Sequence, residues 1–155
     1  MKRYLFCLLV LWICGCSKLE ESPVPNWRVY INIDLRFQDR DLVGSLHHKS
    51  ITSPRTANEY IGYSGVLVIC GFDTTNGGTT YYAYDLCCPN ELKRNTRIEV
   101  NDETATAICP SCGAEFEIAY GAGNPVNNIS RYPLRCYQVI PLTADRQEWV
   151  ITNMN

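Results

Sequence analysis

Histidine is scarce in this sequence. The 155 residues contain two histidines, the adjacent pair His47 and His48, and no Ser/His/Asp arrangement accompanies them. So few imidazoles give no basis for assigning a general base or a histidine-rich metal site. Adjacent histidines in a polar loop can ligate a metal, but they are more typical of a solvated surface.

Long runs of charge are also absent. The chain has 14 Lys and Arg residues and 16 Asp and Glu residues, which gives a formal net charge of −2 at pH 7. Proteins that bind nucleic acid usually carry a basic cluster or stripe. The composition therefore argues against nucleic acid as a partner, and nothing in the sequence indicates a catalytic activity of the protein's own.

The N-terminal region has the pattern of an export signal. Lys2 and Arg3 precede an apolar run over residues 5–13. This run is too short to cross a bilayer as a helix, whereas its length and basic start are typical of a signal peptide.

The apolar run ends at Gly15-Cys16, which resembles the bacterial lipobox, where the cysteine is acylated and becomes the new N-terminus. We therefore expect residues 1–15 to be a lipoprotein signal peptide and Cys16 to carry the lipid that anchors the protein to a membrane of the bacterial cell envelope. Residues 16–26 are polar, contain two prolines and are expected to form a tether. An ordinary signal peptide with an incidental cysteine is the alternative.

Strand patterns fill the rest of the chain. Residues 27–35 alternate apolar and polar side chains, and residues 65–72 form a continuous apolar run bounded by glycines, as a central strand would. Residues 38–62 show no clean period and are expected to be irregular. Further strands are expected at residues 79–85, 97–100, 104–108, 114–118, 134–142 and 148–152. The sequence predicts one all-β domain over residues 27–153, a small antiparallel sandwich or barrel.

Six cysteines follow Cys16, and four of them form two clusters. The clusters are Cys87-Cys88-Pro89 and Cys109-Pro110-Ser111-Cys112-Gly113, and each begins where an expected strand enters a loop. Such spacing brings sulfurs together at two neighbouring loop tips and indicates a metal site, an iron–sulfur cluster or a disulfide.

Residues 65–153 resemble a Rieske-type iron–sulfur domain. The resemblance rests on the order of the motifs: the apolar strand 65–72, the Ala-Tyr-Asp strand entering Cys-Pro at 83–89, Cys-Pro-x-x-Gly followed by Phe at 109–116, Gly-Asn-Pro-Val at 123–126, and Leu-x-x-Tyr-x-Val at 134–139. The resemblance implies an antiparallel β fold with a cysteine-bearing two-loop subdomain that holds a [2Fe–2S] cluster.

The two histidine ligands of that family are missing here. The resemblance places one histidine shortly after Cys88 and the other shortly after Cys109. Asn90 and Cys112 occupy these two positions. Asn is a poor iron ligand, so an ordinary Rieske centre is not expected. Metal ligation by Cys88, Cys109 and Cys112, with Asn90 or water completing the site, is the easier arrangement. An all-cysteine site would add Cys87, but adjacent residues of an extended segment face opposite ways.

Disulfide bonding is the alternative to metal binding. Joining Cys88 to Cys109 or Cys112 would link the two loop tips in an oxidising compartment. Cys70 and Cys136 lie on two expected strands that could be neighbours, and they either form a second disulfide or pack as small apolar side chains. From the residues alone, the cofactor is none or zinc, and a [2Fe–2S] cluster is what the resemblance adds.

Two functions follow from these patterns. The leading hypothesis is a membrane-anchored envelope lipoprotein with a degenerate Rieske-like domain, whose cysteines hold a disulfide or a metal and which serves as a binding or structural module. The alternative is an electron carrier that holds [2Fe–2S] through non-standard ligands and passes electrons to an envelope partner. The absence of His from both loops favours the first.

Overall fold

A computed structural model of the protein describes residues 20–154, and its regular structure is β throughout, as the sequence predicts. One 3₁₀ turn, η1 (Arg40–Leu42), is the exception. Within residues 20–154 no helix has the length and apolar character needed to cross a membrane. The strands are β1 (Val29–Asp34), β2 (His48–Ile51), β3 (Tyr60–Ile61), β4 (Val66–Phe72), β5 (Thr79–Asp85), β6 (Glu99–Asn101), β7 (Thr106–Ile108), β8 (Glu115–Glu117), β9 (Cys136–Pro141) and β10 (Glu148–Thr152).

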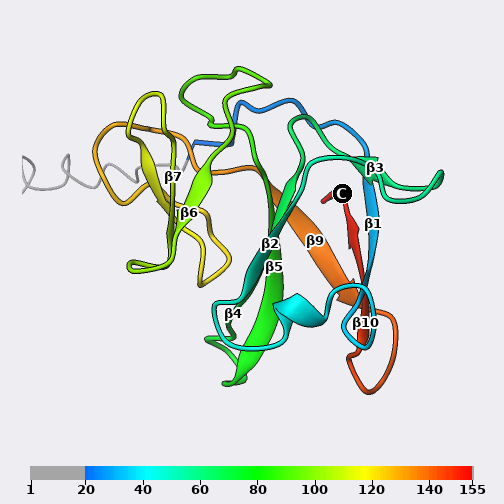
Figure 1. Cartoon of the computed structure of the whole chain (residues 1–155). Coiled ribbons are helices and arrows are strands. Elements are labelled where there is room, and N and C mark those ends of the chain that lie inside the picture. Colours follow the sequence, from blue (N-terminus) through cyan, green and yellow to red (C-terminus); the bar gives the residue numbers. More distant parts are fainter. Residues whose placement is uncertain (1–19, 155) are drawn as a thin grey trace, which may run out of the picture.

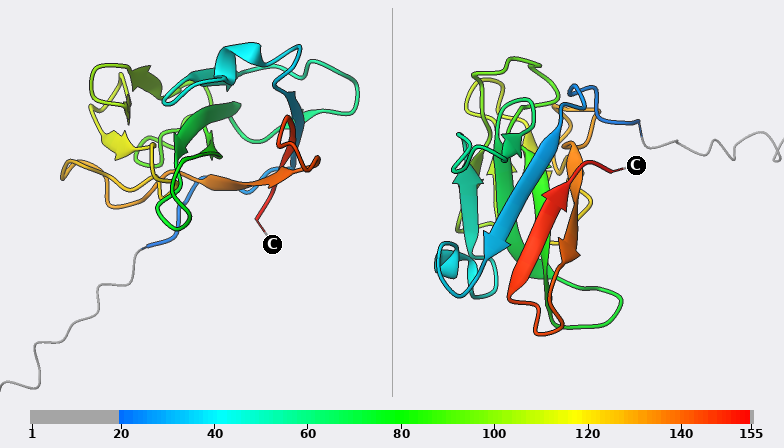
Figure 2. Two further views of the ribbon diagram at one scale, coloured as in Figure 1. Left: turned by 90° about the horizontal axis from the view of Figure 1, so that it is seen from below. Right: turned by 90° about the vertical axis from the view of Figure 1, so that its right-hand side faces the viewer.

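Seven strands form a large antiparallel sheet in the order β2-β4-β5-β9-β10-β1-β3. The sheet curls into a nearly closed barrel (Figure 2). The remaining strands form a small sheet in the order β6-β7-β8, which lies beside the barrel (Figure 1). The predicted small antiparallel barrel with a separate subdomain is therefore confirmed.

Strand β4 is buried on both faces, which explains its continuous apolar sequence. Val66 and Val68 point into the barrel interior, whereas Leu67 and Ile69 belong to a second core. Successive residues of a strand point to opposite faces, so a strand covered on both sides needs apolar residues at every position. The prediction of a central strand at residues 65–72 is confirmed.

The second core lies between the barrel and the small sheet. Tyr84 of β5 contributes to it from the barrel, and Ala107 and Phe116 contribute from β7 and β8. Cys88 and Cys109 are buried in the same core. The two cysteine loops are thus packed between the two sheets.

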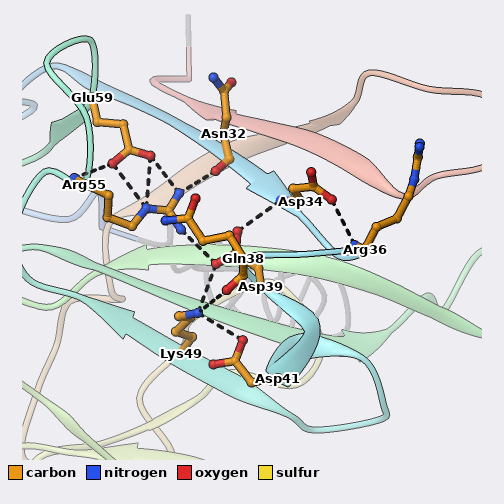
Figure 3. Close-up of polar contacts among 9 residues, drawn as sticks. All are labelled: Asn32, Asp34, Arg36, Gln38, Asp39, Asp41, Lys49, Arg55 and Glu59. Carbon is orange, nitrogen blue, oxygen red and sulfur yellow. Dashed lines mark hydrogen bonds and ion pairs between the residues drawn. The ribbon is translucent and has the colours of Figure 1, made fainter.

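The segment 38–62 is more regular than its sequence suggests, because it contains η1, β2 and β3. A buried ion network holds its loops together (Figure 3). Asp39 is fully buried and lies 2.8 Å from Arg55 Nη1 and 3.1 Å from Lys49 Nζ. Arg55 also pairs with Glu59 at 2.7 Å and donates to the carbonyl of Asn32 on β1. These charged side chains carry no periodic signal, which is why the sequence did not reveal the elements that they support.

Part of the N-terminal segment is held by contacts with the chain just before β9. Val24 is fully buried, and the Arg135 guanidinium donates to the carbonyls of Val24 and Ser22, the latter at 2.7 Å. These contacts fix the described end of the expected tether, although Glu20, Glu21, Pro23, Pro25 and Asn26 are exposed. Residues 16–19, with the predicted lipid-bearing Cys16, and the predicted signal peptide 1–15 lie outside the described residues.

Candidate metal centre

The first cysteine loop begins where β5 ends. Asp85, the last residue of β5, is fully buried, and its carboxylate accepts a hydrogen bond from the Cys87 N–H at 2.8 Å. The same carboxylate accepts from the N–H groups of Tyr63 at 2.9 Å and Ser64 at 3.2 Å. At Cys88 the chain turns, because the Cys88 carbonyl accepts from the N–H groups three and four residues later, at 3.3 and 3.0 Å.

The second loop is the turn between β7 and β8. The Cys109 N–H donates to the carbonyl of Ala114 at 2.8 Å, and the Gly113 N–H donates to the carbonyl of Cys109 at 2.9 Å. Gly113 has φ = +74°, a conformation that glycine adopts without the steric cost of a Cβ. These bonds fix the backbone between Cys109 and Cys112 in a tight turn.

Three sulfurs meet between the loops. The Sγ atoms of Cys88, Cys109 and Cys112 all lie within 4.8 Å of one another, and those of Cys88 and Cys112 are 3.7 Å apart. Cys88 and Cys109 are fully buried, whereas Cys112 is partly exposed. The structure therefore brings together the three residues that the sequence identified as metal ligands, in a cluster that could bind a metal ion.

Cys87 does not join this group. It is fully buried, and its thiol donates to the carbonyls of Cys88 at 3.5 Å and Lys93 at 3.8 Å. It is not among the three sulfurs that approach one another, and adjacent residues of an extended segment face opposite ways. An all-cysteine site with four protein sulfurs does not form in this arrangement.

The pKa values of Cys88 and Cys112 are shifted in opposite directions. Burial raises the pKa of Cys88 to about 12, against the opposing effect of the Asn90 and Glu91 N–H groups. At Cys112 burial also acts to raise the pKa, but hydrogen bonds from the Ala114 N–H, the Asn90 side chain and the neighbouring thiols lower it below its ordinary value. A thiolate at Cys88 needs a cation beside it, which a bound metal ion would supply.

One of the three sulfur–sulfur distances fits a tetrahedral zinc ion, and the other two are at most 4.8 Å. With a Zn–S bond of about 2.3 Å, two sulfurs on a tetrahedral zinc ion lie about 3.8 Å apart. The 3.7 Å between Cys88 and Cys112 matches this spacing. A Rieske-type [2Fe–2S] centre instead needs a histidine pair on its second iron. The group of three sulfurs includes no histidine, so these residues do not fit that cluster.

The two cysteines outside the loops, Cys70 and Cys136, are separated from each other. Cys70 on β4 faces the barrel interior opposite Tyr81, and Cys136 on β9 faces the second core opposite Tyr84. Strand β5 lies between their strands. The prediction that these strands are neighbours is wrong, and the two thiols lie on opposite faces of the sheet. All six cysteines within residues 20–154 are free.

The two histidines lie outside the sulfur group. His47 Nδ1 is 3.1 Å from the carbonyl of Asp41, and His48 Nδ1 is 3.5 Å from Asp102. Neither is part of the candidate metal group found among residues 20–154.

Asp85 and Tyr137 support the site although sequence reasoning did not identify them. The Tyr137 hydroxyl donates to Asp85 at 2.6 Å and so joins β9 to the base of the first loop. A buried aspartate two residues before a cysteine is a weak signal, since the sequence does not show which donors will surround it.

Comparisons with known proteins add no relative. No protein-family model matches the chain, a search of curated proteins finds no match, and a search of solved structures finds none either.

Proposed function

We propose that this protein is an envelope lipoprotein whose β domain binds one zinc ion through the thiolates of Cys88, Cys109 and Cys112. The observation that carries the proposal is the mutual approach of three sulfurs, within 4.8 Å, from loops that belong to two different sheets. The ion would tie the small sheet to the barrel at the tips of the loops. In this role the domain is a binding and structural module of the envelope.

The arrangement of donors supports zinc in particular. Three thiolates suit a d¹⁰ ion that has no geometric preference of its own. Outer hydrogen bonds commonly orient metal ligands, and here the Ala114 N–H and the Asn90 side chain act to lower the pKa of Cys112. Water or an external ligand would take the fourth position, which Cys87 does not reach.

The charge around the site is consistent with three thiolates. Three thiolates and Zn²⁺ have a net charge of −1, so a nearby cation stabilises the complex. Lys93 lies close enough to Cys109 and Cys112 for their negative charge to raise its pKa, although its hydrogen bond with Glu91 is the larger cause. The ammonium group is exposed and offers a screened, favourable interaction.

Metal and sulfide analysis of protein purified without oxygen tests this proposal. We expect about one zinc per chain and no acid-labile sulfide, since zinc uses protein thiolates alone. Iron with equimolar sulfide and visible absorption bands would replace the zinc proposal with an electron carrier. Metal-free protein that does not bind added zinc, although its loop thiols are reduced, would overturn the zinc proposal.

Membrane attachment has its own test. The proposed anchor is the acyl group on Cys16, so Cys16→Ser is expected to abolish lipid labelling and to move the protein out of the membrane fraction. Cys14→Ser is the matched control, because it lies in the same segment and should leave labelling unchanged. Equal labelling of wild type and Cys16→Ser would contradict the lipoprotein proposal.

A further inference from the structure

The sulfurs of Cys88 and Cys112 are placed for a second chemistry besides metal binding. They lie 3.7 Å apart on two different loops and belong to residues 24 positions apart in the chain. A disulfide has an S–S bond of about 2.0 Å, so a sulfur displacement of under about 2 Å separates the two thiols from a covalent bridge.

Of the two cysteines, only Cys112 is accessible to solvent. Cys112 is partly exposed, and its neighbours Pro110 and Ser111 are exposed, whereas Cys88 and Cys109 are fully buried. A reagent from solution therefore meets Cys112 first. Cys88 lies behind it, within reach of any sulfur species formed there, which is the arrangement of an attacking and a resolving thiol.

Cys88 is a better second partner for Cys112 than Cys109. A bridge from Cys88 joins two loops and constrains a long stretch of unfolded chain, whereas a Cys109–Cys112 bridge closes a loop of only a few residues. The backbone bonds from Cys109 to Ala114 and from Gly113 to Cys109 already fix that short turn. The longer bridge would also keep the small sheet attached to the barrel when the ion is absent.

We propose that Cys88 and Cys112 form a redox modification site, at which an incoming disulfide oxidises the pair to an intramolecular disulfide and releases the bound ion. The inference rests on the proposed zinc site for the release, but not for the bridge itself. The ion leaves because two of its three thiolates are consumed, and Cys109 alone holds zinc poorly.

The exchange balances with the incoming disulfide as the oxidant. The Cys112 sulfur attacks one sulfur of the incoming disulfide, whose S–S bond breaks and releases one thiolate. The Cys88 sulfur then attacks Cys112, forms the Cys88–Cys112 bond and expels the second thiolate. Two electrons pass from the cysteine pair to the incoming disulfide, which becomes two thiols after proton uptake from water.

Oxidised glutathione is the probe for this step. The zinc-loaded chain, and the same chain after zinc removal by a chelator, are incubated with it, quenched in acid and alkylated, and the bridges are mapped by peptide mass spectrometry. We expect a Cys88–Cys112 bridge in both samples, two glutathione thiols per bridge, and zinc release at the rate of bridge formation. The Cys87→Ser variant should behave as wild type, and Cys112→Ser should form no bridge between the loops.

The outcomes separate the two proposals. A Cys88–Cys112 bridge in a chain that never binds zinc would keep the redox site and overturn the zinc proposal. Stable zinc binding together with reduced loop thiols in both samples would overturn the redox site and keep the zinc proposal. A Cys109–Cys112 bridge, or glutathione left attached to Cys112 without a second step, would also overturn the redox site.

Discussion

The hydroxyl of Tyr137 on β9 donates a 2.6 Å hydrogen bond to the fully buried carboxylate of Asp85 at the end of β5. The same carboxylate accepts from the backbone N–H of Cys87, the residue before the first sulfur of the site. Burial raises the pKa of Tyr137, so its hydroxyl stays protonated and remains a donor throughout the physiological range. The position of the first cysteine loop thus depends on a side chain 52 residues after Asp85 in the sequence.

Removing this hydroxyl should weaken both the fold and the site. Tyr137→Phe leaves the buried Asp85 carboxylate with one donor fewer, and we expect a loss of about 1–2 kcal/mol in the free energy of unfolding. Zinc affinity should fall as well, because the first loop is held less firmly. Urea denaturation and chelator competition measure the two effects. Tyr120→Phe is the control, since Tyr120 is exposed, and an equal loss in both variants would contradict this role of Tyr137.

Gly113, in the turn of the second loop, can be compared with Gly77, a glycine of the same backbone conformation far from the site. Gly113 and Gly77 both have φ = +74°, and a Cβ would meet only Ile129 at 3.7 Å at the first position and no atom within 4 Å at the second. Alanine at either position should therefore cost about 1 kcal/mol of stability through backbone strain alone. Only Gly113→Ala should also lower zinc affinity, because Gly77 lies in the distant β4–β5 turn. Equal zinc affinity in the two variants would show that the turn geometry does not matter to the site.

The ion network predicts a pH dependence. At Glu59 burial acts to raise the pKa, but hydrogen bonds from Arg55 outweigh it and lower the pKa below 4.5. Because the folded pKa is depressed, the stability from ionised Glu59 is fully present above the ordinary pKa and is lost as the pH falls through the lowered one. Glu59→Gln should cost about 2 kcal/mol near neutral pH, since it breaks a buried pair. Denaturation measured between about pH 7 and pH 2 should show that the difference in free energy of unfolding between wild type and Glu59→Gln becomes smaller in acid.

An exposed glutamate is the control for this pH effect. Glu148 pairs with Arg36 at 3.3 Å on the surface, and Glu148→Gln should change stability by less than about 1 kcal/mol. A Glu59→Gln deficit that stays constant into acid would contradict the assignment of that stability to the ionised carboxylate.

The packing of the N-terminal segment can be tested by hydrogen exchange. Arg135→Ala removes the donors to the carbonyls of Ser22 and Val24, so the Trp27 N–H, which donates to the Pro25 carbonyl at 2.9 Å, should exchange at least tenfold faster while the amides of β4 stay protected. Arg131→Ala is the matched control, because Arg131 is exposed. Unchanged exchange in the Arg135→Ala chain would mean that burial of Val24 alone holds the segment.

Local pattern was enough to predict much of this fold. The apolar run 65–72 and the aromatic strand 79–85 were recognisable because each is long and uniformly patterned, and the structure has β4 and β5 there. The strands expected at residues 97–100 and 104–108 correspond to β6 and β7, which a turn over residues 102–105 joins. Short or charged elements such as β2, β3 and η1 were missed, since tertiary ion pairs around Asp39 support them.

The site also contains residues that local sequence predicts and residues that only the tertiary structure reveals. Cys88, Cys109 and Cys112 were recognisable because sulfur-bearing loops follow strands at suitable spacing. Cys87 was also a candidate, although strand geometry counted against it, and it lies outside the group of three sulfurs. The neighbour relation of Cys70 and Cys136 was wrong, because the order of strands in a sheet is a long-range property that places β5 between them. Asp85 and Tyr137 were not identified for the same reason, since their contact joins distant parts of the chain.

The zinc-to-protein ratio of single serine variants tests the central claim most directly. Reduced protein is given equimolar zinc in the presence of a weak competing chelator, separated by gel filtration and analysed for metal. The account predicts about one zinc per chain for wild type and for Cys87→Ser, and a large loss of zinc for Cys88→Ser, Cys109→Ser and Cys112→Ser, since each removes one of three ligands. Full zinc retention by Cys112→Ser, or loss of zinc in Cys87→Ser to the same extent as in the other variants, would contradict it.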